Sequence, residues 1–336
     1  SACGDSIAIL EHADRALVFA AAGDFRDTAL LLVRWHDGDA ARSYISRRQR
    51  NDESQSDLPE GACFGPVAEW LLTSRRKPDA PPLGPCPKRL ENPSIEQLGE
   101  HVKLGCPCIV SGLLESWPSR QRWASFEYLD SVIGHRLVPV EVGSKAGVAD
   151  WREELMHMGK FLRDHLVPSS EYCTAAKDDG KRSFDADIAY VAQHELLEQC
   201  PVLRPDVLVP DQFCKLLGRP SRTNVWIGTH GTVTPCHWDS YDNFLTQVHG
   251  IKRVVLLPPE DSPHLCVSRG SGIAGTVAAQ GNLSPVDVED PDIQKFPEFA
   301  KASPIVADIG PGDALFIPQG WWHQVRALSP SISVNF

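Results

Sequence analysis

The chain has 336 residues, of which 42% are hydrophobic and 23% charged, and its formal net charge is −11 at pH 7. A protein that neutralises nucleic-acid phosphates normally carries a basic face, so this acidic balance argues against direct nucleic-acid binding. It suits a basic peptide or protein partner better. No apolar run reaches the roughly 18 residues needed to span a membrane, which argues against a membrane partner.

Ten cysteines are scattered along the chain, and only Cys106 and Cys108 lie close together. No second pair of Cys or His follows them at zinc-finger spacing, and their density is low for a disulfide scaffold. We therefore expect reduced, mostly buried thiols in a protein of the nucleus, the cytoplasm or both. The oligomeric state is left open by the sequence, with a monomer favoured.

The N-terminal part is expected to be helical. Residues 5–22 and 28–48 are rich in Ala, Leu and Arg, so residues 1–74 are interpreted as an α-helical region. Residues 75–93 contain six prolines, which lack backbone donors and favour extended chain. This stretch is therefore interpreted as a linker.

The rest of the chain, residues 94–336, is expected to be a mostly β domain with flanking helices. Ser94-Ile-Glu-Gln97 is typical of a capping box and predicts the start of a helix. After it, short β-like runs alternate with turns, as in a barrel or sandwich with its core at about 224–336. The expected strands are 108–110, 137–142, 224–227, 243–248, 253–257, 305–309, 314–317 and 331–336. Helices are expected at 149–166 and 193–198, and an irregular, functional or mobile stretch at 258–304.

A candidate metal site stands in Thr234-Pro-Cys-His-Trp-Asp239. Residues two apart in an extended chain point to the same face, so His237 and Asp239 can share one metal ion. A third ligand, His323, is offered by Ile317-Pro-Gln-Gly-Trp-Trp-His323. Two histidines and one carboxylate on one face of an octahedron leave three open positions, the pattern of non-haem Fe(II) oxygenases. A tetrahedral zinc site with one open position remains an alternative.

A candidate anion site follows in Asn243-Phe-Leu-Thr-Gln-Val-His-Gly-Ile-Lys252. His249-Gly250 is typical of a hairpin turn, which places Lys252 at the start of the returning strand. A lysine that points into a barrel needs an anion, because an unpaired buried charge is costly. Strand alternation alone leaves open whether Lys252 or Arg253 faces inward.

From about residue 107 to 336 the chain resembles the JmjC hydroxylase family, most closely its JMJD-five branch. The resemblance runs through Ser116-Trp-Pro118, Val138-Pro-Val-Glu-Val-Gly143, Tyr190-Val-Ala-Gln-His194, Asn224-Val-Trp-Ile-Gly228 and the metal segment. It implies a double-stranded β-helix, the jelly-roll barrel of the cupins. Members of the branch are described both as protein-arginine hydroxylases and as lysine demethylases.

The resemblance also implies roles for individual residues. By it, Fe(II) would bind His237, Asp239 and His323, and 2-oxoglutarate, used together with O₂, would bind Lys252, Thr234, Asn243 and Tyr190. Substrate would bind Glu141, Trp226 and Gln193. A carboxylate and an aromatic face suit a guanidinium group, so the expected activity is C-hydroxylation of a protein arginine. Demethylation of histone methyl-lysine and a non-catalytic peptide-binding barrel remain alternatives.

Two further motifs are set aside. Gly270-Ser-Gly-Ile-Ala-Gly275 matches a dinucleotide-binding pattern, but no βαβ unit surrounds it. His194-Glu195-Leu-Leu-Glu198 begins like a zinc-protease helix but lacks the second histidine, so no metal is expected there. Residues 266–281 look like an insertion relative to the family.

Overall fold

A computed structural model describes residues 13–14, 58–65, 67, 72, 82–143, 151–174, 187–220, 222–267 and 281–336. The helices expected at 5–22 and 28–48 lie outside these residues, except for Ala13 and Asp14, which are helical. The glycine-rich motif at 270–275 lies outside them as well. Within the described residues no helix has the length and apolar character needed to cross a membrane.

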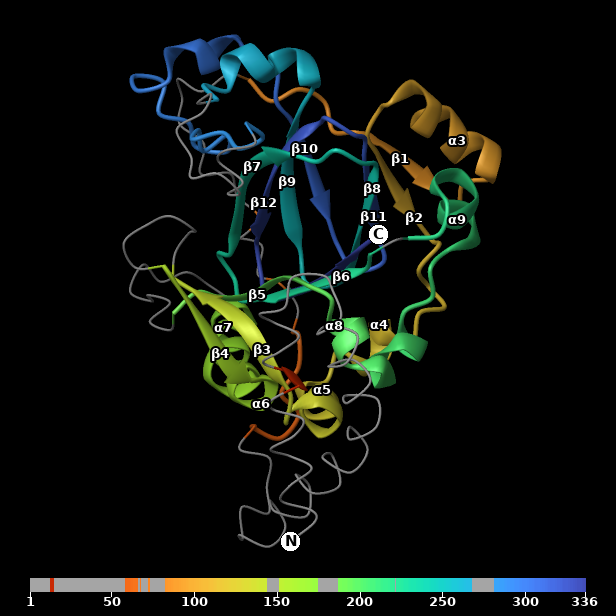
Figure 1. Cartoon of the computed structure of the whole chain (residues 1–336), viewed down its shortest axis with the longest axis vertical. Coiled ribbons are helices and arrows are strands. Elements are labelled where there is room, and N and C mark those ends of the chain that lie inside the picture. The colour runs from red at the N-terminus through yellow and green to blue at the C-terminus, as the bar shows by residue number, and fades with distance from the viewer. Residues whose placement is uncertain are drawn as a thin grey trace, which may run out of the picture.

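Two β-sheets form the centre of the structure (Figure 1). One has nine strands in the order β1-β2-β11-β8-β13-β6-β5-β3-β4, and the other has four in the order β10-β9-β12-β7. The strands are β1 (Lys88–Glu91), β2 (Cys108–Ser111), β3 (Leu137–Val142), β4 (Arg152–His157), β5 (Ala189–His194), β6 (Asn224–Gly228), β7 (Val233–Trp238), β8 (Asn243–His249), β9 (Lys252–Leu257), β10 (Ile305–Ile309), β11 (Ala314–Ile317), β12 (Trp322–Ala327) and β13 (Ser331–Asn335).

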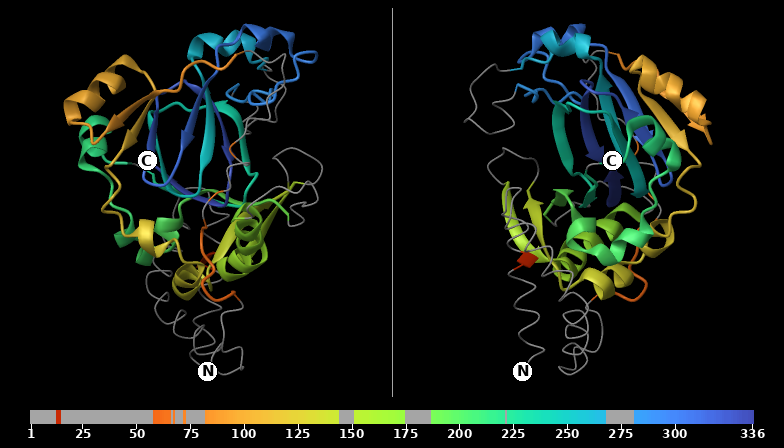
Figure 2. Two further views of the ribbon diagram at one scale, coloured as in Figure 1. Left: turned by 180° about the vertical axis from the view of Figure 1, so that it is seen from behind. Right: turned by 45° about the vertical axis from the view of Figure 1, so that its right-hand side comes forward.

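The strands β6 to β13 form a jelly roll. Four of them, β11-β8-β13-β6, lie together in the large sheet, and the other four make up the small sheet. The two sheets face one another (Figure 2), and every residue of β8 and β9 is buried. In β9 this burial on both faces agrees with the continuous apolar run Val254–Leu257, whereas β8 also buries polar side chains. The predicted mostly β, double-stranded β-helix fold is confirmed.

Helices cover the outside of this barrel (Figure 1). Phe213 of α9 stacks on Phe244 of β8 with their rings 2° from parallel, which fixes α9 on the large sheet. The described helices are α3 (Ile95–Leu104), α4 (Ser119–Arg122), α5 (Phe126–Ile133), α6 (Met158–Phe161), the π-helix η2 (Leu162–Leu166), α7 (Val167–Thr174), α8 (Leu196–Gln199), α9 (Asp211–Leu217) and the 3₁₀ helices η3 (Pro201–Asp206), η4 (Pro259–His264) and η6 (Pro297–Lys301).

The capping box predicted at residues 94–97 is present. The Ser94 hydroxyl accepts a hydrogen bond from the Gln97 backbone N–H at 3.2 Å, and the Gln97 side chain accepts one from the Ser94 N–H at 2.9 Å. At the other end, Gly105 adopts the left-handed conformation with φ 60° and ends α3. Local signals therefore set both ends of this helix.

Two helix predictions need correction. Residues 152–157 of the expected helix 149–166 form β4, which pairs with β3 in antiparallel register from Arg152 to His157. Pairing with a neighbouring strand outweighs the helix propensity of Arg-Glu-Glu-Leu-Met. The helix expected at 193–198 begins only at Leu196, because β5 continues to His194.

The stretch expected to be a linker contributes to the sheet. Its residues Lys88–Glu91 form β1, which pairs in parallel with β2. Phe64, which precedes the proline-rich stretch in the sequence, packs on residues of α5 and β8. Its ring lies edge-on to Phe126 at 4.8 Å and stacks on His249 at 5.2 Å. Described residues on both sides of the proline-rich stretch thus pack against one body.

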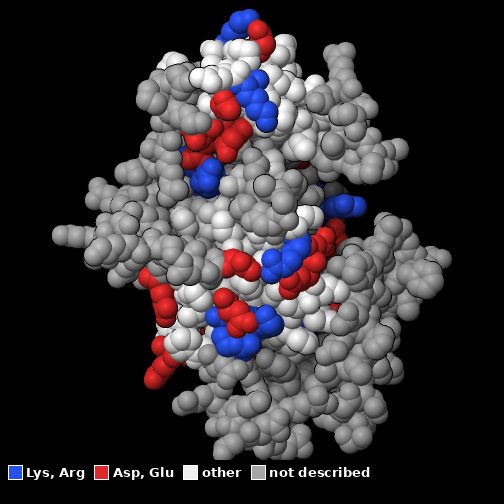
Figure 3. Space-filling view, turned by 90° about the vertical axis from the view of Figure 1, so that its left-hand side faces the viewer, with Lys and Arg blue, Asp and Glu red and all other residues white. Residues whose placement is uncertain are grey.

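Charged side chains of the described residues are distributed over the surface without large patches of one sign on the face viewed (Figure 3). On the face in Figure 3, acidic and basic side chains of the described residues lie in small mixed groups, without a continuous basic surface.

The described cysteines are free thiols. Four of them are buried and three exposed, so the expectation of mostly buried thiols is only partly met.

Candidate functional site

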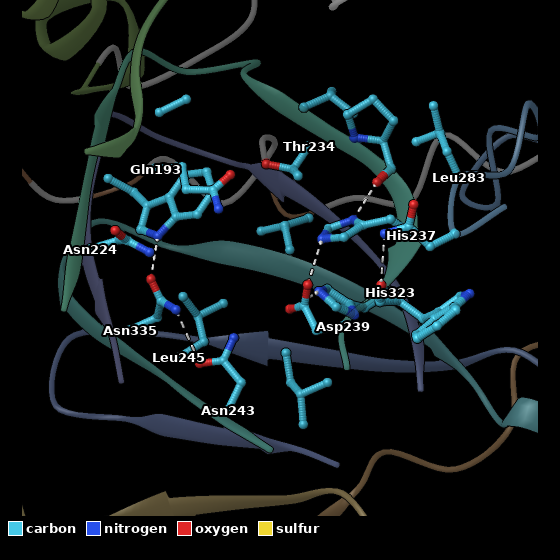
Figure 4. A pocket seen from close by; sticks show the side chains of 18 of the residues that line it. Gln193, Asn224, Thr234, His237, Asp239, Asn243, Leu245, Leu283, His323 and Asn335 are labelled. Atoms are coloured by element: carbon cyan, nitrogen blue, oxygen red, sulfur yellow. Dashed lines mark hydrogen bonds and ion pairs between the residues drawn. The ribbon is translucent and has the colours of Figure 1, made fainter. Parts of the chain in front are cut away.

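A cavity of about 640 Å³ opens between the two sheets. It is lined by side chains from both, and its polar members converge on its interior (Figure 4). All ten side chains singled out from the sequence line this one cavity: Glu141, Tyr190, Gln193, Trp226, Thr234, His237, Asp239, Asn243, Lys252 and His323.

Two neighbouring strands bring the candidate metal ligands together. In the antiparallel pair of β7 and β12, His237 lies opposite His323, and their ring centroids are 4.2 Å apart. Asp239 follows β7 directly; its two carboxylate oxygens lie 3.8 Å from His237 Nε2 and 3.7 Å from His323 Nε2. One ligand atom from each residue lies within 4.8 Å of the others, which is suitable spacing around a single ion.

The two imidazoles are oriented by the same device. Nδ1 of His237 hydrogen-bonds the Pro235 carbonyl oxygen at 2.8 Å, and Nδ1 of His323 hydrogen-bonds that of Trp321 at 3.0 Å. A carbonyl only accepts, so each Nδ1 carries the proton and each Nε2 keeps a lone pair that is free to bind a metal ion together with the Asp239 carboxylate. Figure 4 shows the three side chains pointing toward one another.

Burial sets the protonation of this cluster. It lowers the pKa of His323 to about 3, helped by the nearby His237 and opposed by the Trp321 carbonyl. It also raises the pKa of Asp239, against the attraction of His237. A neutral imidazole is the form that binds a metal, and a cation among these donors would stabilise the Asp239 carboxylate. The donor set therefore fits a divalent metal.

The loops beside the ligands are tied to each other. The Gly320 N–H donates to the Asp239 carbonyl oxygen at 2.9 Å, and the Gln319 N–H donates to Asp242 Oδ1 at 2.9 Å. These bonds join the loop after β7 to the turn before β12. The relative positions of Asp239 and His323 are thereby fixed by backbone contacts.

Lys252, at the start of β9, is only 1% exposed. Its Nζ donates to the Tyr190 hydroxyl at 3.2 Å and lies 5.4 Å from the Tyr190 ring centroid and 6.0 Å from that of Trp226. Among the described residues no carboxylate pairs with it, and burial lowers its pKa to about 7. Arg253 points elsewhere, to Asp308 at 2.8 Å. The alternative left open by the sequence is thus decided for Lys252.

Asparagines that sequence reasoning missed complete the wall beside Trp226. Its indole N–H donates to Asn335 Oδ1 at 2.8 Å, and Asn335 Nδ2 donates to Asn243 Oδ1 at 3.3 Å. Asn224 lies opposite Asn335 in the pairing of β6 and β13 and also lines the cavity. The sequence of β13, Ser-Ile-Ser-Val-Asn, mixes polar and apolar residues, so nothing in it singled out Asn335.

Glu141 and Gln193 lie on the large-sheet side of the cavity. Glu141 is opposite Tyr190 in the pairing of β3 and β5. Burial raises the pKa of its carboxyl; the Trp151 indole opposes this and Glu153 adds to it. Gln193 has φ 47° at an irregularity where the register of β5 with β6 shifts. Such a bulge re-aims a side chain, here into the cavity.

A segment after the expected insertion covers the free edge of β7. The Trp238 N–H donates to the Asn282 carbonyl at 3.1 Å, and the Ser284 N–H donates to the Cys236 carbonyl at 2.8 Å. The Ser284 hydroxyl also donates to the Leu265 carbonyl at 2.7 Å. Asn282 lines the cavity, and no sequence signal pointed to it.

Comparison with known proteins agrees with this architecture. A family model described as a cupin-like domain matches residues 94–336. Lysine-specific demethylase 8 of Xenopus tropicalis is 37% identical over 253 residues, covering 74% of this chain and 52% of that protein.

The chain belongs to the cupin-like JmjC family.

Lysine-specific demethylase 8 of Danio rerio is 36% identical to this JmjC chain, over 80% of the chain and 63% of the relative. Jumonji C domain-containing protein 5 of Drosophila melanogaster is 32% identical, over 74% and 58%. The chain thus spans about half to three fifths of the length of these curated relatives. The family predicted from the sequence is confirmed, and the roles of single residues stay predictions.

Proposed function

We propose that this JmjC chain is an Fe(II)- and 2-oxoglutarate-dependent oxygenase that hydroxylates a carbon of a protein arginine side chain. The observation that carries the proposal is Lys252, buried in the cavity that contains the His237, Asp239 and His323 donors. An ammonium group in such a place needs an anion. A dicarboxylate that reaches both the metal and Lys252 satisfies both requirements, whereas a zinc hydrolase leaves Lys252 unexplained.

The side chains of the cavity would bind the metal and the cosubstrate. His237, Asp239 and His323 would hold Fe(II), which together with 2-oxoglutarate and O₂ supplies the oxidation of an unactivated C–H bond. Lys252 would pair with the distal carboxylate of 2-oxoglutarate. Hydrogen bonds to 2-oxoglutarate would come from residues that line the same cavity: Thr234, Tyr190 and Asn243.

Three residues of the large sheet support a basic side chain as substrate. The Glu141 carboxyl is partly buried, and none of the described residues gives it a cationic partner; a guanidinium group would be one. The Trp226 ring offers an aromatic face for stacking on the same group. Gln193 would contribute a neutral donor and acceptor at the entrance.

Demethylation of methyl-lysine is the second candidate, and the names of the Xenopus and Danio relatives favour it. Glu141 and Trp226 also suit a methylammonium group. A peptide assay separates the two: hydroxylation adds one oxygen to the product mass, whereas demethylation removes a methyl group and releases formaldehyde. The third candidate, a barrel that binds a basic peptide without turnover, requires a cavity that takes neither metal nor 2-oxoglutarate.

We also propose the arrangement of the chain and its setting. Residues 94–336 would form the catalytic domain, preceded by the helical region 1–74 and the proline-rich stretch 75–93. Free thiols among the described cysteines support a nuclear or cytoplasmic location. A monomer that acts on a protein or peptide is the simplest state that agrees with the cavity.

The test is an anaerobic titration of the metal-free protein with Fe(II) and 2-oxoglutarate, followed by the visible charge-transfer absorbance of the chelate. We expect a band in the wild type and none in His237→Ala. In Lys252→Ala the band should require at least 30-fold more 2-oxoglutarate, because a partner in a buried charge pair contributes roughly 2–5 kcal/mol.

Circular dichroism of each variant establishes that it is folded before the titration is interpreted. The Lys301→Ala variant is the matched control, since Lys301 lies on η6, pairs with Glu298 and is largely exposed. No band in folded, fully metallated wild type would overturn the oxygenase proposal and favour the binding barrel.

A further inference from the structure

A buried ion pair joins the N-terminal part of the chain to the start of β3. Arg136 and Asp14 are both 0% exposed, and the guanidinium meets the carboxylate through Nε at 3.0 Å and Nη2 at 2.5 Å. The Leu137 N–H also donates to Asp14 Oδ2 at 3.1 Å. The bidentate ion pair thus links two residues that are 122 positions apart in the sequence. Asp14 is therefore part of the interior around β3.

The contact continues through Gln199 at the end of α8. Arg136 Nη2 donates to the Gln199 carbonyl oxygen at 2.7 Å. The side chain of the same glutamine donates to the Leu137 carbonyl at 2.7 Å, and its Oε1 lies 2.6 Å from His194 Nε2. Gln199 is 2% exposed, so water offers these groups little competition.

His194 is the last residue of β5 and immediately follows Gln193, the left-handed residue of the bulge. Beyond the shift in register, His194 lies opposite Val225 of β6, the neighbour of Trp226. A non-glycine residue with positive φ is held only where its surroundings fix it. The hydrogen bond from His194 to Gln199 is such a constraint on the bulge.

We infer that the Asp14–Arg136 pair is a positioning element for the substrate wall of the cavity. Arg136 donates to the Gln199 carbonyl oxygen, and the Gln199 side chain hydrogen-bonds His194. His194 in turn fixes the bulge that turns Gln193 into the cavity. The inference rests on the proposed function only in calling this wall the substrate side. Asp14 would thus help to determine how well the wall is ordered, although it does not line the cavity.

Hydrogen exchange of the full chain tests this without any ligand. In Asp14→Asn we expect amides of β5 (Ala189–His194) to exchange at least about fivefold faster, as loss of roughly one hydrogen bond's net stability predicts. Amides of β9 (Lys252–Leu257), in the other sheet, should keep their rates. Unchanged rates in β5, or the same acceleration in β5 and β9, would overturn the inference.

A matched control separates positioning from a general loss of stability. Asp313 also forms an ion pair, with Arg89, and accepts from the Ser111 hydroxyl, but at the opposite edge of the large sheet. Asp313→Asn should lower the melting temperature without accelerating exchange in β5. If it accelerates exchange in β5 as much as Asp14→Asn does, the hydrogen bonds through Gln199 do not order β5 specifically, and the inference is wrong.

Gln199, which lies between the ion pair and His194, gives a second variant that leaves the ion pair in place. Gln199→Leu removes the side-chain bonds to His194 and to the Leu137 carbonyl but keeps Asp14 with Arg136. It should accelerate exchange at Gln193 and His194 as Asp14→Asn does, and unchanged exchange there would contradict the inference. Binding of Mn(II) with 2-oxoglutarate, measured on the same samples, reports separately on the proposed function.

Discussion

The two sheets contribute different things to the cavity. The small sheet carries the candidate metal ligands on two adjacent strands, β7 and β12, whose register places His237 opposite His323. The large sheet carries the candidate substrate residues on β3, β5 and β6, where Glu141, Gln193 and Trp226 come from separate parts of the chain. The metal ligands therefore depend on the pairing of β7 with β12, whereas the substrate residues depend on the pairing of β3, β5 and β6.

The difference also extends to what holds each half in place. Metal-side residues are fixed by backbone contacts, such as those of Asp239 and of both Nδ1 atoms. Substrate-side residues depend on a bulge and on side-chain hydrogen bonds such as the one from Trp226 to Asn335. We therefore expect changes on the small sheet to abolish metal or cosubstrate binding. Changes to Glu141, Gln193 or Trp226 on the large sheet should weaken substrate binding and leave the metal in place. Tyr190 and Asn243 also lie on the large sheet, and they are proposed to bind the cosubstrate.

The largest effect should follow removal of a ligand on the small sheet. His323→Ala should lower the affinity for Mn(II) by more than about 100-fold, because even residues that only support a ligand contribute roughly 10–100-fold. Isothermal titration calorimetry of the metal-free protein measures this. His264→Ala, on η4 outside the cavity lining, is the control and should bind as the wild type does. Equal affinities in both variants would contradict the metal assignment.

The cost of burying the charge of Lys252 should be measurable in the free energy of unfolding of the ligand-free protein. Its pKa of about 7 when folded lies below the ordinary 10.5, so the folded state resists protonation. The resulting destabilisation is complete below pH 7 and disappears as the pH rises toward 10.5. Lys252→Met should therefore raise the free energy of unfolding at pH 6.5 by on the order of a few kcal/mol, and by much less at pH 10.

Urea unfolding at the two pH values measures this difference. Lys301→Met serves as the control, because the Lys301 side chain is 62% exposed and should contribute little at either pH. A gain in Lys252→Met that does not depend on pH would contradict the lowered pKa of Lys252.

On the large sheet, Glu141→Ala should separate cosubstrate turnover from substrate turnover. We expect 2-oxoglutarate consumption without peptide to persist, while hydroxylation of an arginine peptide falls at least 30-fold, since truncating one partner of a buried charge pair costs about 2–5 kcal/mol. Glu153→Ala, its cross-strand neighbour outside the cavity lining, is the control. Equal loss of both reactions would place Glu141 on the cosubstrate side.

The smallest effect should come from Trp226→Phe, which keeps an aromatic ring and removes the hydrogen bond to Asn335. Loss of one such bond is worth about 1 kcal/mol, so peptide affinity should fall about fivefold while Mn(II) affinity stays the same. Trp321→Phe removes an indole hydrogen bond to Gly105 outside the cavity and is the matched control. A larger loss of metal than of peptide affinity would contradict the division between the sheets.

The sequence predicted the features that local pattern determines. Strands 137–142, 305–309 and 314–317 have the predicted bounds. The ten candidate side chains, most of them named from the resemblance to the JmjC family, line one cavity. It did not predict β4, whose residues prefer a helix until β3 lies beside them. Neither the bulge at Gln193 nor the partner of Arg136 could be read from the sequence, because each depends on residues distant along the chain.

The hydrogen bond from the Ser284 hydroxyl to the Leu265 carbonyl has a consequence for chain length. The bond joins Leu265 to Ser284, so these two described residues lie side by side although 19 positions separate them in the sequence. The entropic cost of closing a loop grows only by about 0.6 kcal/mol for each doubling of its length. Inserted residues between Leu265 and Ser284 should therefore be tolerated, which makes this a place to carry an affinity tag or a fluorescent label close to the cavity.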